Sequence, residues 1–216
     1  MDNQIGVTYT GDNTARMVEA GSTGEAIAGA AAVVLGILGL IGVYPSALDS
    51  IACIAAGAGL LMAGGAIAGR FSRLANSSES NQPRQEVTGS LGMEALAGAA
   101  GVVLGILALL GVGTISLLAV AAIVLGAGLI MAGGTRSRLE SMSRLHVTGE
   151  SRTMQDVVYV SSGSDVLVGV GTIVLGILAL SGIAPLTLTL VSMLAVGAAI
   201  LLGGSTIAAQ AFRYFG

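Results

Sequence analysis

The forty residues from Ala95 to Gly134 contain no ionisable side chain, and this stretch restricts the fold more than any other feature. A helix needs about 20 apolar residues to cross a hydrocarbon layer of roughly 30 Å, so the stretch is long enough for two crossings. The turn between the two crossings is predicted at Gly111-Val112-Gly113-Thr114. Charged residues make up only 10% of the whole chain, far less than a soluble domain of this length needs to cover its surface. The stretch is therefore predicted to form a membrane hairpin.

The hairpin is one of three similar units. The string Val34-Leu35-Gly36-Ile37-Leu38 returns at 103–107 and at 174–178, at intervals of 69 and 71 residues. A string kept at nearly constant spacing indicates internal repetition. We therefore expect an all-α membrane protein whose six transmembrane helices form three repeated helical hairpins.

Polar segments separate the three units. The predicted divisions are a cytoplasmic N-terminal segment (1–24), hairpin repeat 1 (25–69), a cytoplasmic linker (70–93), hairpin repeat 2 (94–134), a second cytoplasmic linker (135–164) and hairpin repeat 3 with a short C-terminal tail (165–216). The other two turns are predicted at Tyr44-Pro45-Ser46 and Ala184-Pro185-Leu186-Thr187, because proline ends one helix and, in the first of these turns, serine can start the next. All nine basic residues are arginine, and none lies in a predicted turn. The positive-inside rule then places both termini in the cytoplasm.

Each predicted helix carries two glycines seven residues apart. Seven residues are close to two helical turns, so both glycines share one face and let a neighbouring backbone approach. We predict that these glycines are the helix-packing residues. They are Gly29, Gly36, Gly57, Gly64, Gly98, Gly105, Gly126, Gly133, Gly169, Gly176, Gly197 and Gly204.

One carboxylate recurs at the start of every repeat, as Glu25, Glu94 and Asp165. A negative side chain in the first helical turn offsets the positive end of the helix dipole, and this is our preferred interpretation. The alternative is a ring of three acids that binds a cation or gathers protons. Asp49 has no counterpart in the other repeats and is likewise expected to suit a helix N-terminus, whereas an acid within a span would mark a functional site.

Arginines are expected to anchor the even-numbered helices at the membrane surface, through the helix dipole and lipid headgroups. These anchors are Arg70, Arg73, Arg136, Arg138 and Arg213. The sequence offers no pair of ionisable groups suited to acid–base or nucleophilic catalysis within the spans, and no metal-ligand spacing, so neither an enzyme nor a metal or cofactor site is predicted. Without a basic patch and interleaved aromatics, a nucleic-acid partner is not expected either.

The hairpin pattern also resembles a known family. The run Val33 to Leu40, the turn Pro45-x-x-Leu48, repeated as Pro185-x-x-Leu188, and the ending Gly57 to Gly65 look like the HdeD-like family of small acid-resistance membrane proteins. The second repeat departs from this pattern, because it has Gly113-Thr114 where proline would stand. The resemblance implies a multi-pass inner-membrane protein linked to stress or acid tolerance, without a defined catalytic site.

Two classes of function stay open from the sequence. The preferred one is a non-catalytic structural or accessory protein of the bacterial inner membrane or its internal extension. Its partners would be membrane lipids and a second copy or a larger membrane complex. The alternative is a small channel or carrier for a neutral or weakly polar solute. Polar side chains within the spans would have to line its path, and the candidates are Ser50, Thr172, Thr189 and Ser192.

Overall fold

The computed structural model is all-helical in the residues that it describes. It describes the backbone of residues 5–77, 84–143 and 152–214, and the side chains of residues 23–64, 93–134 and 164–204. The helices in these ranges are α1 (Ile5–Leu40), α2 (Pro45–Ser77), α3 (Arg84–Leu109), α4 (Thr114–Ser143), α5 (Arg152–Leu180) and α6 (Pro185–Tyr214).

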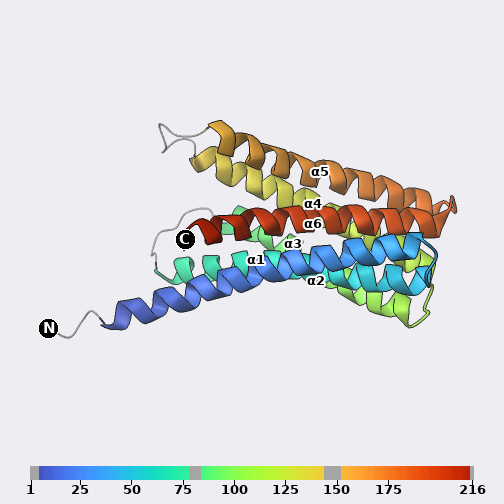
Figure 1. Ribbon diagram of the computed structural model, residues 1–216, viewed down its shortest axis with the longest axis horizontal. Coiled ribbons are helices and arrows are strands. Elements are labelled where there is room, and N and C mark those ends of the chain that lie inside the picture. Colours follow the sequence, from blue (N-terminus) through green and yellow to red (C-terminus); the bar gives the residue numbers. More distant parts are fainter. Residues whose placement is uncertain (1–4, 78–83, 144–151, 215–216) are drawn as a thin grey trace.

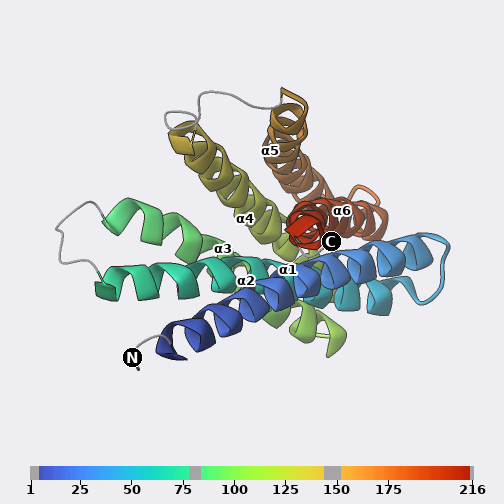
Figure 2. The ribbon, with the colours of Figure 1, turned by 60° about the vertical axis from the view of Figure 1, so that its left-hand side comes forward.

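The six helices form a ring around a centre made by the even-numbered helices. Each odd helix packs on the even helix that follows it, so α1–α2, α3–α4 and α5–α6 are hairpins. Each odd helix also packs on an even helix of another hairpin, in the pairs α2–α3, α4–α5 and α1–α6. Helices α2, α4 and α6 contact one another, whereas no contact between odd helices occurs in the part of the chain that the structure describes. All three tight turns lie at one end of the bundle (Figure 1), and pairs α2–α3 and α4–α5 point apart at the other end (Figure 2).

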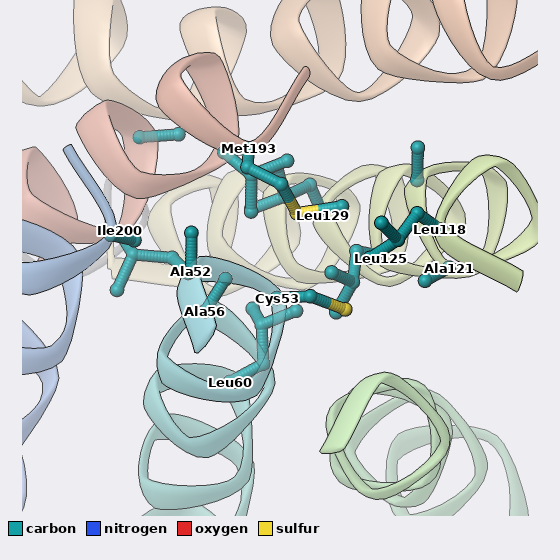
Figure 3. Packing of buried hydrophobic residues seen from close by; sticks show 14 of the residues in the cluster. Ala52, Cys53, Ala56, Leu60, Leu118, Ala121, Leu125, Leu129, Met193 and Ile200 are labelled. Atoms are coloured by element: carbon teal, nitrogen blue, oxygen red, sulfur yellow. The ribbon is translucent and has the colours of Figure 1, made fainter. Parts of the chain in front are cut away.

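The centre of the bundle is filled by small and branched apolar side chains of the even helices. Ala52 and Ala56 of α2 lie in one cluster with Leu125 of α4 and Met193 of α6, and all four are buried (Figure 3). Small residues let the helices come close, and the larger ones occupy the remaining space. The cluster therefore packs the even helices together by dispersion contacts along their length.

Large apolar side chains cover the outside of the bundle. Val34, Val103 and Val174 occupy equivalent positions of the three odd helices, and about half of each side chain is exposed. Four helical segments are long and apolar enough to cross a membrane, namely Thr23–Leu40, Pro45–Gly64, Thr114–Gly134 and Pro185–Gly204. Shorter apolar segments lie in α3 and α5. An apolar exterior over long apolar helices indicates a multi-pass integral membrane protein.

The three turns share one hydrogen-bond pattern. In the first, the N–H of Val43 donates to the carbonyl of Leu38, and the N–H of Gly42 donates to the carbonyl of Gly39. The same two bonds recur around Gly111 and Gly182. This is the Schellman arrangement, which requires a left-handed residue after the helix, and glycine meets that need at φ 97°, 84° and 86°. The turn residues are 41–44, 110–113 and 181–184, and the next helix begins at Pro45, Thr114 or Pro185. The first and third turns were therefore predicted a few residues too late, because a glycine, and not the proline, ends each odd helix.

The helices extend farther into the polar segments than the sequence predicts. Helix α1 begins at Ile5, inside the predicted N-terminal segment, and α2 continues to Ser77, beyond the predicted start of the linker. Similarly, α4 and α5 take up much of the segment 135–164. A loss of hydrophobicity marks the end of an apolar run, but many polar residues have good helix propensity and continue the helix. Pro83, the predicted break in the first linker, directly precedes Arg84 at the start of α3 and lies outside the described residues.

This extension changes the place of the arginine anchors. Arg70 and Arg73 lie inside α2, and the last turns of α2 and α4 contain no basic residue. The prediction that these arginines complement a helix C-terminus is therefore wrong for both helices. Arg213 does lie next to the end of α6. The side chains of all five predicted anchors (Arg70, Arg73, Arg136, Arg138 and Arg213) fall outside the described residues.

The turns contain two residues with an unfavourable backbone conformation. Tyr44 and Ala184 have φ values of 40° and 39°, and Gly113 takes the equivalent position with φ 54°. We expect Ala184→Gly to raise the free energy of unfolding by about 1 kcal/mol, because glycine relieves the left-handed strain at a smaller entropic cost. Thermal unfolding in detergent, followed by circular dichroism, measures the change. Gly113→Ala should lower the free energy of unfolding by a similar amount. A loss of stability in Ala184→Gly together with a gain in Gly113→Ala would contradict the interpretation that these positions are strained.

Candidate functional site

Three interfaces between hairpins are built on glycines, and we call them the glycine seams: α2–α3, α4–α5 and α1–α6. In the α2–α3 seam, a Cβ atom on Gly57 would lie 2.7 Å from the carbonyl oxygen of Gly98, and one on Gly98 would lie 2.7 Å from the carbonyl oxygen of Gly57. A Cβ atom does not come that close to an oxygen, so the two backbones meet only because neither residue has a side chain.

The other two seams repeat this geometry. A Cβ on Gly126 would lie 2.7 Å from the oxygen of Gly169, and one on Gly169 would lie 2.6 Å from the oxygen of Gly126. In the α1–α6 seam, the corresponding distances are 2.8 Å from Gly29 to the oxygen of Gly197 and 3.0 Å in the reverse direction. The closing seam between the first and last helices therefore uses the same contact as the two seams between consecutive helices.

The second glycine of each odd helix lies along the same seams. A Cβ on Gly105 would meet Ile54 Cγ1 at 2.7 Å, and one on Gly176 would meet Ile123 Cγ1 at 2.7 Å. At Gly36 the closest atom would be Leu194 Cβ at 3.2 Å, which a small shift accommodates. The α1–α6 seam is thus looser at this level than the other two.

The second glycines of the even helices lie at the far end of the seams. A Cβ on Gly64 would lie 2.9 Å from the backbone nitrogen of Ala95. Gly133 and Gly204 are buried at the equivalent positions. The other ten predicted glycines lie between helices, but the sequence did not indicate which helix each one contacts.

The repeated carboxylates lie in the interior of the odd helices and not at their starts. Glu25, Glu94 and Asp165 are only 4%, 1% and 3% exposed, and the first turns of α1 and α5 contain no acid. The proposed role at a helix N-terminus is therefore wrong, because the helices begin well before these residues. Among the described side chains, no group of three or more His, Cys, Asp or Glu is placed to hold a metal ion.

Asp49 is a fourth buried acid, and the sequence analysis also placed it wrongly. It is fully buried in α2, beyond the first turn, and its Oδ2 lies 2.5 Å from Oγ1 of Thr189 in α6. Its other oxygen, Oδ1, has no hydrogen-bond partner among the described residues. Asp49, Leu118 and Thr189 are equivalent positions of the three repeats. This equivalence is visible in the sequence, and it could have indicated that Asp49 and Thr189 lie at the same level of the bundle.

Three other buried hydroxyls donate within their own helices, and the buried thiol of Cys53 donates to a neighbouring helix. The hydroxyls of Ser50, Thr172 and Ser192 each donate to the carbonyl four residues earlier in the same helix, at 2.7 to 2.9 Å. The thiol of Cys53 donates to the carbonyl of Gly101 in α3 at 3.3 Å. Three of the four hydroxyls that were candidates for a solute path therefore bond only to their own helices, and Thr189 is the exception.

Comparisons with protein-family models, with curated proteins and with solved structures found no match to this chain.

Two glycines of α5 provide a matched test of the seams. Gly169 contacts Gly126 across the α4–α5 seam, whereas a Cβ on Gly171, two residues later, would have no atom within 4 Å. We expect Gly169→Ala to lower the free energy of unfolding by about 1–3 kcal/mol, because the methyl group forces the backbones apart. Gly171→Ala should instead raise it by roughly 0.5–1 kcal/mol, since alanine favours the helix. Denaturant unfolding in detergent measures the free energy of unfolding of both variants. Equal changes in the two variants would contradict the close backbone contact at Gly169.

Proposed function

We propose that this chain is a non-catalytic structural or accessory protein of the membrane, in which all six helices cross the bilayer as three hairpins. The observation that carries the proposal is the closed ring of glycine seams with an apolar exterior. The seams use the backbone to hold the hairpins together, and the outer faces of the odd helices stay available to lipid or to other membrane helices. A bundle of this kind serves as a scaffold for assembly.

The packing of α3 and α5 supports six crossings. Their described apolar segments, Met93–Leu109 and Ser164–Leu180, are 17 residues long, which at 1.5 Å per residue gives roughly 26 Å. Each of these helices packs against two even helices that are long enough to span. A helix that lies between two spanning neighbours shares their depth, so α3 and α5 belong in the hydrocarbon layer with them.

The arginine distribution supports an orientation with both termini in the cytoplasm. The three turns lie at one end of the bundle and contain no arginine (Figure 1). Every arginine belongs to the terminal or linking segments at the other end of the hairpins. Arginine is retained on the cytoplasmic side of membranes, so the turns face the opposite side.

A channel or carrier has less support than an accessory role. The centre of the bundle is filled by a continuous apolar cluster, and the buried hydroxyls of the spans bond to their own helices. Solute paths require polar groups that are available to the solute. A stress or acid-resistance role stays an expectation from the family resemblance.

The orientation can be tested with single cysteines. Replacing Cys53 with alanine removes the only native cysteine, after which Tyr44→Cys and Ser77→Cys place one thiol at each end of α2. In intact cells, a membrane-impermeant maleimide should label position 44, which is highly exposed at a turn, and should label position 77 only after permeabilisation. Labelling with the opposite order would refute the proposed orientation.

The accessory role predicts the composition of the native particle. Extraction from membranes in mild detergent, followed by native mass measurement, should recover the chain with stoichiometric copies of itself or of other membrane proteins. Replacing the outward-facing Val103 and Ile106 by polar residues should reduce this association, because both side chains face away from the bundle. Recovery of a lone monomer that retains only lipid would contradict the accessory role.

A further inference from the structure

The hydroxyl oxygen of Thr189 lies within hydrogen-bond distance of two other oxygens, one in the carboxyl group of Asp49 and one in the backbone carbonyl of Leu186. Oγ1 of Thr189 lies 2.5 Å from Oδ2 of Asp49 and 3.1 Å from the carbonyl oxygen of Leu186. A hydroxyl carries one proton and can donate only one straight hydrogen bond, whereas a carbonyl can only accept. If Thr189 donates to Leu186, the proton between Thr189 and Asp49 must come from Asp49.

The surroundings of Asp49 favour the same distribution of protons. An ionised carboxylate has two charged oxygens that both need donors, but Oδ1 of Asp49 has none among the described residues. The ranges with described side chains contain no Lys, Arg or His to balance a negative charge. The nearest titratable group along α2 is the Cys53 thiol, which is buried and donates to Gly101, while Tyr44 is exposed at the turn.

The helices packed against Asp49 bring no charge to it either. Helix α6 faces it with Thr189, and the equivalent position of α4 is the buried Leu118. Glu25, Glu94 and Asp165 lie in the interior of their helices, each 15 residues before the helix end at the turn, which is about 22 Å along the helix axis. A buried charge without a partner is strongly unfavourable, and a neutral acid avoids that cost.

We propose that Asp49 is a proton-binding site, held in the folded protein as a neutral carboxylic acid that donates to Thr189 Oγ1, while Thr189 donates to the carbonyl oxygen of Leu186. In this arrangement each of the two short oxygen–oxygen contacts is a hydrogen bond, and the bond between Asp49 and Thr189 links α2 to α6 near the turns. It also makes the α2–α6 contact different from the α2–α4 and α4–α6 contacts, since Leu118, the equivalent residue of α4, has no side-chain group that forms hydrogen bonds. The assignment does not depend on the accessory role.

The proton gives the α2–α6 contact a defined dependence on pH. In the unfolded chain Asp49 is exposed and loses its proton at neutral pH, whereas the folded protein retains it. The folded state therefore binds more protons, and its stability should fall as pH rises. Deprotonation would leave a buried anion beside Thr189 and weaken the link between the two helices.

Infrared difference spectroscopy of the purified protein at neutral pH tests the site directly. We expect wild type to show a carboxylic acid C=O band that is missing in Asp49→Asn. In Thr189→Val the band should move to higher frequency, because the acid loses its hydrogen-bond acceptor. Thr172→Val is the matched control, since the Thr172 hydroxyl is buried but bonds only to Val168 of its own helix. It should leave the Asp49 band unchanged.

Several outcomes would overturn the proposal. If Asp49→Asn removes a carboxylate band and no acid band, Asp49 is an anion, with or without a bound cation, and the proton site is wrong. An identical shift in Thr172→Val and Thr189→Val would also refute it. If Asp49→Asn does not fold, the comparison of wild type with Thr189→Val still tests the protonation of Asp49. A neutral Asp49 gives an acid band that shifts in Thr189→Val, whereas an ionised Asp49 gives no acid band that could shift. A folded Asp49→Asn variant should show a flatter decline of thermal stability with rising pH than wild type.

Discussion

The structure depends on the close approach of helix backbones at the glycine pairs. Within lipid, apolar side chains gain little by leaving the acyl chains, so helices associate through dispersion contacts that grow as their axes approach. Gly57 with Gly98 and Gly126 with Gly169 allow this approach because neither partner has a Cβ. Gly29 with Gly197 closes the ring in the same way without a linker. The contact is therefore a property of the repeated residues and does not require consecutive helices.

Closing the ring places different chemistry inside and outside the bundle. The even helices meet in the centre with alanine, leucine and methionine, and the odd helices expose valine and isoleucine. Nothing in the described exterior offers a charged surface. Interaction with other membrane components would then rely on shape and dispersion, as the proposed accessory role requires.

The buried hydroxyl groups divide into two kinds. Ser50, Thr172 and Ser192 bond to carbonyls of their own helices. Asp49 and Thr189 instead join α2 to α6 across the centre. A side-chain hydrogen bond between helices is directional, unlike a dispersion contact, so it can fix the relative height of two helices that apolar surfaces alone would allow to slide.

The sequence by itself determined the helical class, the apolar segments and the positions of the three turns to within a few residues, because hydrophobicity and the glycine and proline signals are local. It also indicated that the glycines share helix faces, since a period of seven fixes a face. Only the tertiary structure decided which faces meet, the burial of Glu25, Glu94 and Asp165, and the pairing of Asp49 with Thr189, 140 residues away. Periodicity gives the direction of a side chain relative to its helix axis, but the partner depends on how the whole ring closes.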